Sequence, residues 1–252
     1  GIELSYAPDG SVYVLDWSDI GECHDNDGIH RTSGRIYRIS YGKTEAAKVD
    51  LTKWSNEDLA ESVGSPNEWY SRQARQLIQQ RAAAGQDLTK AALKLMNTYR
   101  LTSSTPTALR AMWTLNAIGS ADEDWLLEQS NDEREHIRTW AIKLLCDQEA
   151  LSKKTQKRLI EMGGQDKAGL VQLQLASAMQ QLPLEDRWPL ANALVSQDTF
   201  AKDPVFPLLV WYGINPAVTE NRNASLKLVA QCKIPKVRQF IARRLAGEAG
   251  KE

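Results

Sequence analysis

The sequence contains few cysteines, little net charge and no long apolar run. Its three cysteines are widely spaced and odd in number, which argues against a disulfide framework. Its 31 basic and 32 acidic residues leave a formal net charge of −1, so the chain lacks the positive field that attracts nucleic acid or an anionic membrane surface. No stretch approaches the roughly 18 consecutive apolar residues of a membrane-spanning helix. We therefore expect no nucleic-acid partner and no membrane contact from this segment.

Sequence motifs for catalysis and cofactor attachment are missing as well. The chain contains no phosphate-binding glycine loop, no nucleophile elbow and no Cys-x-x-Cys-His sequence for haem attachment. We therefore expect no cofactor in this segment and no catalysis by the segment alone. The first residues also lack a charged-then-apolar leader, so no signal peptide is expected here, and the chain is expected to begin within a domain.

The first part of the chain shows the period-two pattern of β-strands. Apolar and polar residues alternate over residues 2–7, 11–17 and 35–40, and these runs are rich in β-branched and aromatic residues. The sequence Pro8-Asp9-Gly10 favours a turn between the first two runs, because proline fixes φ and glycine tolerates positive φ. Three strands seldom form a domain unaided. We therefore expect this β segment, residues 1–42, to pack on the helices or on sequence outside the chain.

From Leu51 onward the apolar period becomes that of amphipathic helices. Ser65, Pro66 and Glu68 predict one helix start, with a serine N-cap and a glutamate that closes a capping box. Glycines predict where helices end. These glycines are Gly85, Gly119, Gly163, Gly164, Gly213 and Gly247.

An early arginine followed by an apolar stripe recurs in the helical part of the chain. The four arginines are Arg72, Arg110, Arg138 and Arg238. Their spacing is unequal, which fits HEAT repeats better than the stricter tetratricopeptide or ankyrin periods. The sequence therefore predicts a mainly α fold. It consists of a HEAT-like α-solenoid, an α-α superhelix of about six helix pairs over residues 51–250, preceded by a short three-stranded antiparallel β segment.

The recurrent arginines have two interpretations. One is a ladder of cations that binds an acidic partner along one surface. The other is a set of ion pairs with carboxylates of the adjacent repeat. Ion pairs between helices are common, so the sequence favours the second interpretation.

One short polar loop holds five potential metal or haem ligands, which are Cys23, His24, Asp25, Asp27 and His30. An EF-hand is excluded, because Gly34 stands where that loop requires a bidentate glutamate. Zinc binding through the cysteine and the two histidines is chemically possible, although adjacent side chains seldom reach the same tetrahedral ion. The alternative is a polar loop ordered by Asx turns.

Residues 8–17, 21–31 and 34–39, which include Pro8-Asp9-Gly10 and the polar loop, resemble the last propeller blade of a family of membrane-bound proteins. These are the sorbosone-dehydrogenase-like proteins of planctomycetes and verrucomicrobia. Residues 51–77 are similar to the first HEAT pair of the same family. Its members carry HEAT repeats after the propeller and often end in a c-type haem domain. The resemblance covers roughly the first third of the chain, and the remainder is generic repeat.

The resemblance implies a place within a larger redox protein. Most of a propeller would precede this chain, and the quinone or haem c of the whole protein would bind outside it. The resemblance also implies an extracytoplasmic location, in the periplasm or at the membrane. We expect a non-catalytic scaffold or spacer module that contacts other domains of the same chain or protein partners. The alternative is a fragment of a sorbosone- or glucose-dehydrogenase-like oxidoreductase, in which loop 23–30 contributes to a metal, haem or quinone site.

Overall fold

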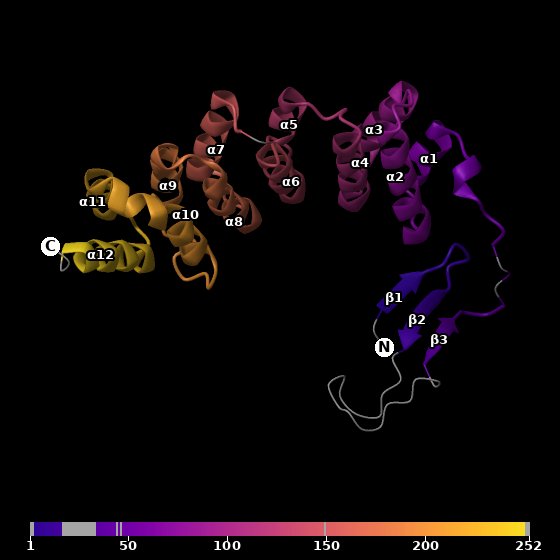
Figure 1. Ribbon diagram of the computed structural model, residues 1–252, viewed down its shortest axis with the longest axis horizontal. Coiled ribbons are helices and arrows are strands. Elements are labelled where there is room, and N and C mark those ends of the chain that lie inside the picture. Colours follow the sequence, from indigo (N-terminus) through magenta and orange to yellow (C-terminus); the bar gives the residue numbers. More distant parts are fainter. Residues whose placement is uncertain (1–2, 17–33, 44, 46, 149, 250–252) are drawn as a thin grey trace. The chain divides into compact units, whose positions relative to one another are not determined.

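A computed structural model describes residues 3–16, 34–43, 45, 47–148 and 150–249 of the chain (Figure 1). The chain falls into two compact units, Gly1–Ser120 and Ala121–Glu252. Among the described residues, the first unit contains three β-strands and four α-helices, and the second contains eight α-helices. The predicted mainly helical fold with a small antiparallel sheet at its start is thus confirmed. No helix of the described residues is both long enough and apolar enough to cross a lipid bilayer.

The sheet has the order β1-β2-β3, and both pairings are antiparallel. Its strands are β1 (Glu3–Tyr6), β2 (Val12–Asp16) and β3 (Arg35–Ile39), as the alternating pattern predicts. The turn before β2 also forms as predicted. Gly10 adopts a φ of 82°, and its backbone N–H donates to the Ala7 carbonyl at 3.0 Å.

Two side chains connect the sheet to its surroundings. The Asn67 amide, just before α2, donates to the backbone oxygens of Ala7 at 3.0 Å and Pro8 at 3.3 Å. Arg38 of β3 forms an ion pair with Asp9 of the turn. The turn is therefore held from the helical side by an amide and from the far strand by a guanidinium.

The helices of the first unit pack on one another around a small apolar interior. They are η1 (Leu51–Lys53), α1 (Asn56–Ser62), α2 (Glu68–Ala83), α3 (Thr89–Leu101) and α4 (Thr105–Ala117). α1 contacts α2 and α3, and α4 contacts the same two helices. Leu59, Ile78, Leu95 and Met112, one from each α-helix, are fully buried between them. The apolar sides of these four helices, which the helical period of the sequence predicts, thus face one another.

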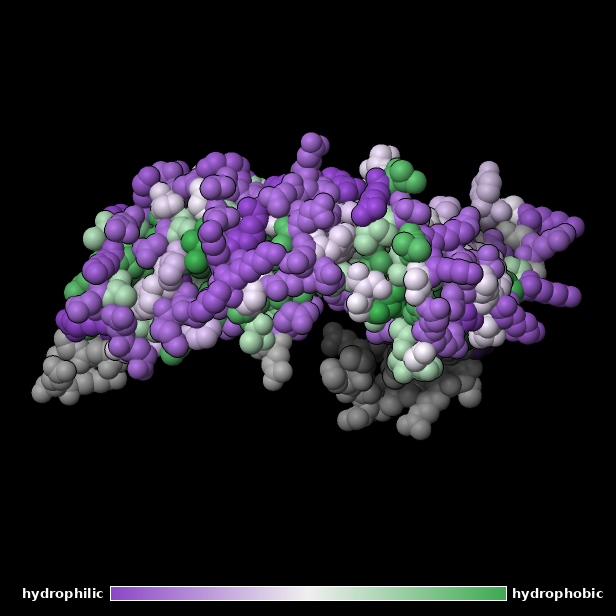
Figure 2. All heavy atoms as spheres, turned by 90° about the horizontal axis from the view of Figure 1, so that it is seen from above, coloured by the Kyte–Doolittle hydropathy of each residue, from purple (hydrophilic) through white to green (hydrophobic). Residues whose placement is uncertain are grey.

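The second unit continues with helices connected by short segments (Figure 1). They are α5 (Glu123–Gln129), α6 (Glu135–Cys146), α7 (Lys153–Gln165), α8 (Gly169–Ala178), η2 (Met179–Gln181), η3 (Leu184–Asp186), α9 (Arg187–Val195), α10 (Phe206–Glu220), α11 (Arg222–Gln231) and α12 (Pro235–Ala249). One continuous cluster of buried apolar side chains runs from Ile142 in α6 to Leu245 in α12. Figure 2 shows mostly hydrophilic residues over the helical surface in view, with apolar residues in scattered patches.

The helix start predicted at Ser65 is wrong. α2 begins at Glu68, and its N-cap is Asn67, whose side-chain oxygen accepts from the Trp69 N–H at 2.9 Å. Ser65 accepts from the Asn67 N–H at 3.2 Å, and Glu68 pairs with Arg110 in α4 instead of closing a capping box. Asn67 is the better cap here, because its amide nitrogen also holds the β-turn while its oxygen caps the helix.

Two of the six glycines predicted to end helices do so. Gly85 and Gly119 follow α2 and α4 with φ values of 74° and 73°, the left-handed conformation that glycine adopts without a steric penalty. The other four glycines lie inside helices, so the predicted ends there are wrong. They are Gly163, Gly164, Gly213 and Gly247.

Close packing explains two of these internal glycines. A Cβ atom at Gly163 in α7 would lie 3.2 Å from the Ala193 Cβ of α9. A Cβ atom at Gly213 in α10 would lie 3.0 Å from the Met179 sulfur. Glycine therefore allows a close approach at both positions, which a single sequence does not distinguish from a helix end.

Candidate functional site

The predicted metal or haem ligands Cys23, His24, Asp25, Asp27 and His30 lie outside the described residues. Within the described part of the chain, no three side chains of histidine, cysteine, aspartate or glutamate gather as metal ligands would. Cys146 is buried, and burial raises the pKa of its thiol to about 12. Because the thiolate is the reactive and metal-binding form, Cys146 is an inert core residue.

The recurrent arginine Arg138 forms an ion pair with a carboxylate outside its own helix, which is the type of contact that the second interpretation predicts. Its Nε donates to Asp166 Oδ2 at 2.7 Å, and its Nη2 donates to Asp166 Oδ1 at 3.0 Å. The Nη1 atom donates to the backbone oxygens of Asp132 at 2.9 Å and Glu133 at 3.0 Å. One guanidinium thus links α6, the segment before it, and the segment between α7 and α8.

Electrostatics at this pair favour the charged state of both partners. The hydrogen bonds with Asp166 raise the pKa of Arg138 above its ordinary value, against the effect of burial. Burial acts to raise the pKa of Asp166, but the Arg138 hydrogen bonds and the backbone N–H of Ala168 outweigh it and lower that pKa. The bidentate geometry is the strongest form of such a pair. The pair is therefore suited to holding helices together.

The other recurrent arginines differ from one another. Arg110 in α4 pairs with Glu68 in α2, again as the second interpretation predicts. Arg72 lies 3.5 Å from the same Glu68 carboxylate, but within one helix. Arg238 is exposed on α12. The four arginines therefore do not form one ladder of equivalent contacts.

Three further arginines, which are not among the four recurrent ones, donate to backbone carbonyls and thereby connect helices. Arg81 of α2 donates to Thr52 O at 2.9 Å and Trp54 O at 2.8 Å. Arg158 of α7 donates to the Ser130 carbonyl at 3.0 Å. These contacts satisfy carbonyls at helix ends, where the helix itself provides no donor.

Arg187 of α9 makes the most extensive contact of this kind. It donates to the carbonyls of Gln180 at 3.1 Å, Leu182 at 2.9 Å and Gly213 at 2.6 Å. Burial lowers the pKa of its guanidinium. Sequence offers no signal for these partners, because any backbone carbonyl accepts equally well.

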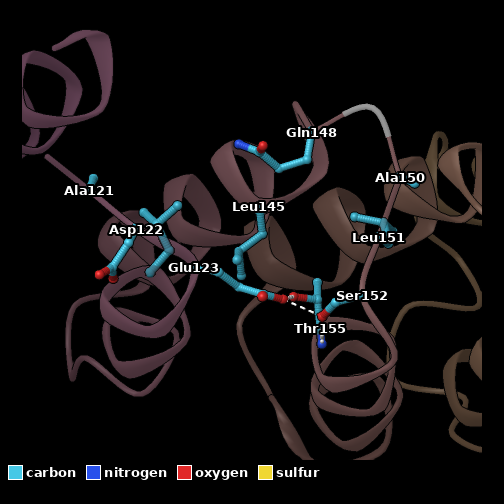
Figure 3. Close-up of a pocket in the computed structure, with 10 residues that line it drawn as sticks. Ala121, Asp122, Glu123, Leu145, Gln148, Ala150, Leu151, Ser152 and Thr155 are labelled. Carbon is cyan, nitrogen blue, oxygen red and sulfur yellow. Dashed lines mark hydrogen bonds between the residues drawn. The ribbon is translucent and has the colours of Figure 1, made fainter. Parts of the chain in front are cut away.

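A hollow of about 310 Å³ lies among α5, α6 and the start of α7 (Figure 3). Leu126 and Leu145 form part of its apolar lining. Figure 3 shows the Glu123 carboxylate turned toward Ser152 and Thr155. The Thr155 hydroxyl donates to this carboxylate at 2.5 Å, and the Ser152 hydroxyl donates to the same oxygen.

The carboxylate in this hollow is not suited to proton transfer near neutral pH. Hydrogen bonds from Ser152 and Thr155 hold the pKa of Glu123 below its ordinary value, whereas a general base requires a pKa near the working pH. Two hydroxyl donors already occupy one of its oxygens. We therefore interpret this network as a connection between α5 and α7.

The sheet presents one apolar face to its surroundings. The register places Leu4, Val14 and Tyr37 in one row across the strands, and Tyr6, Val12 and Ile39 in the next row on the same face. Four of these six side chains are at least half exposed: Leu4 at 70%, Tyr6 at 51%, Tyr37 at 52% and Ile39 at 60%. Contiguous exposed apolar rows of this kind mark surfaces that pack against another element.

Comparison of the chain with models of known protein families yields no match, and comparison with curated protein sequences yields none either. Its function is therefore inferred from the residues and contacts described above.

Proposed function

We propose that residues 51–250 form a HEAT-like α-solenoid that acts as a non-catalytic scaffold or spacer within a larger redox protein. The observation that carries this proposal is the order in which the helices pack. In the first unit α1 contacts α3, and α2 contacts α4. In the second unit α5 contacts α7, α6 contacts α8, α7 contacts α9, α8 contacts α10, α9 contacts α11, and α10 contacts α12.

Contact between each helix and the second helix after it is the pattern expected of stacked helix pairs. In such a stack each pair covers the apolar stripes of its neighbour, and the core extends along the chain instead of closing on itself. The core cluster from Ile142 to Leu245 supports this interpretation, because it joins successive helices from α6 to α12.

Ion pairs and carbonyl contacts support the same interpretation. Arg110 reaches from α4 to Glu68 in α2, Arg138 reaches from α6 to Asp166 after α7, and Arg158 reaches from α7 to the segment after α5. Each arginine contacts a neighbour one repeat away. These links explain why arginines recur in the sequence without forming a catalytic group.

The exposed face of the sheet supports a place within a larger protein. Strands β1 and β3 are both edge strands, and each has apolar side chains in the exposed rows. A second sheet of the same polypeptide can cover these rows without the large interface that separate proteins need, because the covalent connection keeps it nearby. A further propeller blade, as the family resemblance implies, would be such a sheet.

Hydrogen exchange of single-site variants tests the solenoid. Ile241 in α12 and Ile142 in α6 are both fully buried, and replacement of either with alanine should cost about 2–5 kcal/mol. Ile241→Ala should lower the protection of amides in α11, α12 and the adjacent α10, with α5 and α6 unchanged. Ile142→Ala is the matched control and should act on α5 to α8, with α12 unchanged.

The outcome that contradicts the solenoid is equally specific. If both substitutions lower protection to the same extent from α5 to α12, the second unit is one cooperative globular core. The place in a larger redox protein requires a separate test. Sequence preceding this chain in the complete open reading frame should encode β-strand repeats, and unrelated sequence there would remove the support for a redox context.

A further inference from the structure

The chain has a nearly balanced overall charge, but residues 221–247 are strongly basic. Between residues 221 and 247 the sequence contains seven basic residues and no acidic residue. Since the whole chain has a formal net charge of −1, subtracting these seven positive charges leaves a net charge of −8 for the remainder. The stretch is bounded by Glu220 and Glu248, and it covers α11 and most of α12.

Six of these cations lie on α11, on α12 or on the segment between the two helices. We refer to them together as the basic surface: Arg222, Lys227, Lys233, Lys236, Arg238 and Arg243. All six are exposed. No ion pair joins any of them to a carboxylate within the described residues. Three lysines elsewhere in the chain do have such partners, because Lys94 pairs with Glu61, Lys153 with Asp186 and Lys154 with Asp124.

Two of these cations also occupy unfavourable positions in their helices. Arg222 is the first residue of α11, and Lys236 is the second residue of α12. The helix dipole places partial positive charge at these ends, so cations there are disfavoured. Lys153 and Lys154 at the start of α7 occupy similar positions, but acidic partners offset their charge. Cations at a helix start without acidic partners violate the usual preference for acidic residues there, and such violations are typical of functional surfaces.

We infer that the basic surface of α11 and α12 binds an acidic segment of another protein. Leu226, half exposed at 50% on α11, lies beside Lys227 in the sequence, and an apolar contact beside cations suits a peptide that carries both acidic and apolar side chains. Single-stranded nucleic acid fits less well, because it is bound through aromatic stacking platforms. The one aromatic residue of these two helices, Phe240, packs against Trp211 with ring centroids 5.5 Å apart.

The test uses the whole chain and a fluorescein-labelled decapeptide of glutamate, followed by fluorescence anisotropy at low salt. The charge-reversed variant Lys227→Glu/Lys236→Glu/Arg243→Glu should weaken binding at least about tenfold. The matched control is Lys48→Glu/Lys90→Glu/Lys202→Glu, which changes the net charge equally at exposed lysines outside the basic surface. The control should stay within about twofold of the wild type. Raising the salt concentration should weaken wild-type binding and reduce the difference between the two variants.

Several results would overturn the inference. Equal weakening by both triple variants would show that only the overall charge matters, and absence of peptide binding at low salt would remove the site. Tighter binding of a single-stranded DNA 20-mer than of the peptide would assign the surface to nucleic acid. Self-association of the wild type in analytical ultracentrifugation, lost in the charge-reversed variant, would assign it to a second copy of this chain. Unchanged circular dichroism of both variants ensures that a loss of binding does not reflect unfolding.

Discussion

Arg138 in α6 and Asp166 after α7 form a bidentate ion pair, with both carboxylate oxygens within 3.0 Å of guanidinium nitrogens. Their side chains are only 17% and 9% exposed, so water screens the pair weakly. Arg138 also satisfies two backbone carbonyls. This one side chain therefore combines charge, fixed geometry and capping at the contact between α6 and the next helices.

Substitution of Arg138 should separate the effects of charge and geometry. Arg138→Met should lower the unfolding free energy by about 1–3 kcal/mol, because it leaves Asp166 without its partner and two carbonyls without a donor. Arg138→Lys keeps the charge but loses the fork and should cost nearly as much. Urea denaturation of Arg138→Met, Asp166→Asn and the double variant gives the coupling energy. A coupling energy near zero would show that the pair does not contribute to stability.

Acidification should reduce stability through Asp166. The pKa of Asp166 is lowered from 3.8 in the folded chain, so its contribution is fully present above the unfolded-state pKa and is lost as the pH falls through the folded-state pKa. The unfolding free energy of wild type should therefore exceed that of Asp166→Asn at neutral pH, and the difference should shrink below about pH 4. Urea denaturation at a series of pH values measures this difference. A constant difference across the series would contradict the assignment.

The two adjacent glycines in α7 should respond oppositely to alanine. A Cβ atom at Gly164 meets nothing within 4 Å, whereas one at Gly163 would lie 3.2 Å from both Ala193 Cβ and Leu190 Cδ1. Gly164→Ala should raise the unfolding free energy by about 0.5–1 kcal/mol through helix propensity. Gly163→Ala should instead lower it by about 1–3 kcal/mol, since α7 and α9 must separate. Thermal unfolding of the two variants is the measurement, and a gain in stability for both would show that α7 and α9 do not approach this closely.

The apolar face of the sheet should matter only in a longer polypeptide. Tyr37→Thr and Ile39→Thr should each change the unfolding free energy of this chain by less than about 0.5 kcal/mol, because both side chains are exposed. If the chain belongs to a longer protein in which a second sheet covers this face, as proposed, each substitution should cost about 1–3 kcal/mol in that protein. Tyr41→Thr, at a fully exposed position outside the sheet, is the control for both cases. If Tyr37→Thr changes the unfolding free energy equally in this chain and in the longer protein, no second sheet covers this face.

The loop at 23–30 lies outside the described residues, and its ligands are tested directly. If Cys23, His24 and His30 hold an ion, the purified chain should contain stoichiometric metal by elemental analysis, and His24→Ala with His30→Ala should abolish it. Haem is measured on the same samples by absorption spectroscopy. His136→Ala, which removes the third histidine of the chain, is the matched control. Absence of metal and haem, both in this chain and in a longer protein that contains it, would rule out an ion or haem site. It would favour the alternative interpretation, a polar loop ordered by Asx turns.

Local patterns in the sequence are sufficient to predict the types of secondary structure and their order. Alternating residues predicted the three strands, and apolar stripes with helical period predicted the helices, because both patterns depend on neighbours within a few positions. The turn at Gly10 and the helix ends at Gly85 and Gly119 follow for the same reason. The ion pairs of Arg110 and Arg138 were anticipated as a type of contact, although the acidic partners were not.

The contacts that residues make across helices depend on how the helices pack in three dimensions. Gly163 carries the local pattern of a helix end, but it lies inside α7 where Ala193 of α9 comes close. Ser65 carries the pattern of a helix cap, but Asn67, which also holds the β-turn, caps α2 instead. Arg187 has no sequence signal, because its acceptors are backbone carbonyls, and one of them, the Gly213 carbonyl in α10, lies far from it along the chain. The basic surface is visible as a run of charge, yet the absence of described carboxylate partners appears only in three dimensions. Such contacts depend on how close separate helices come, and local sequence does not encode that distance.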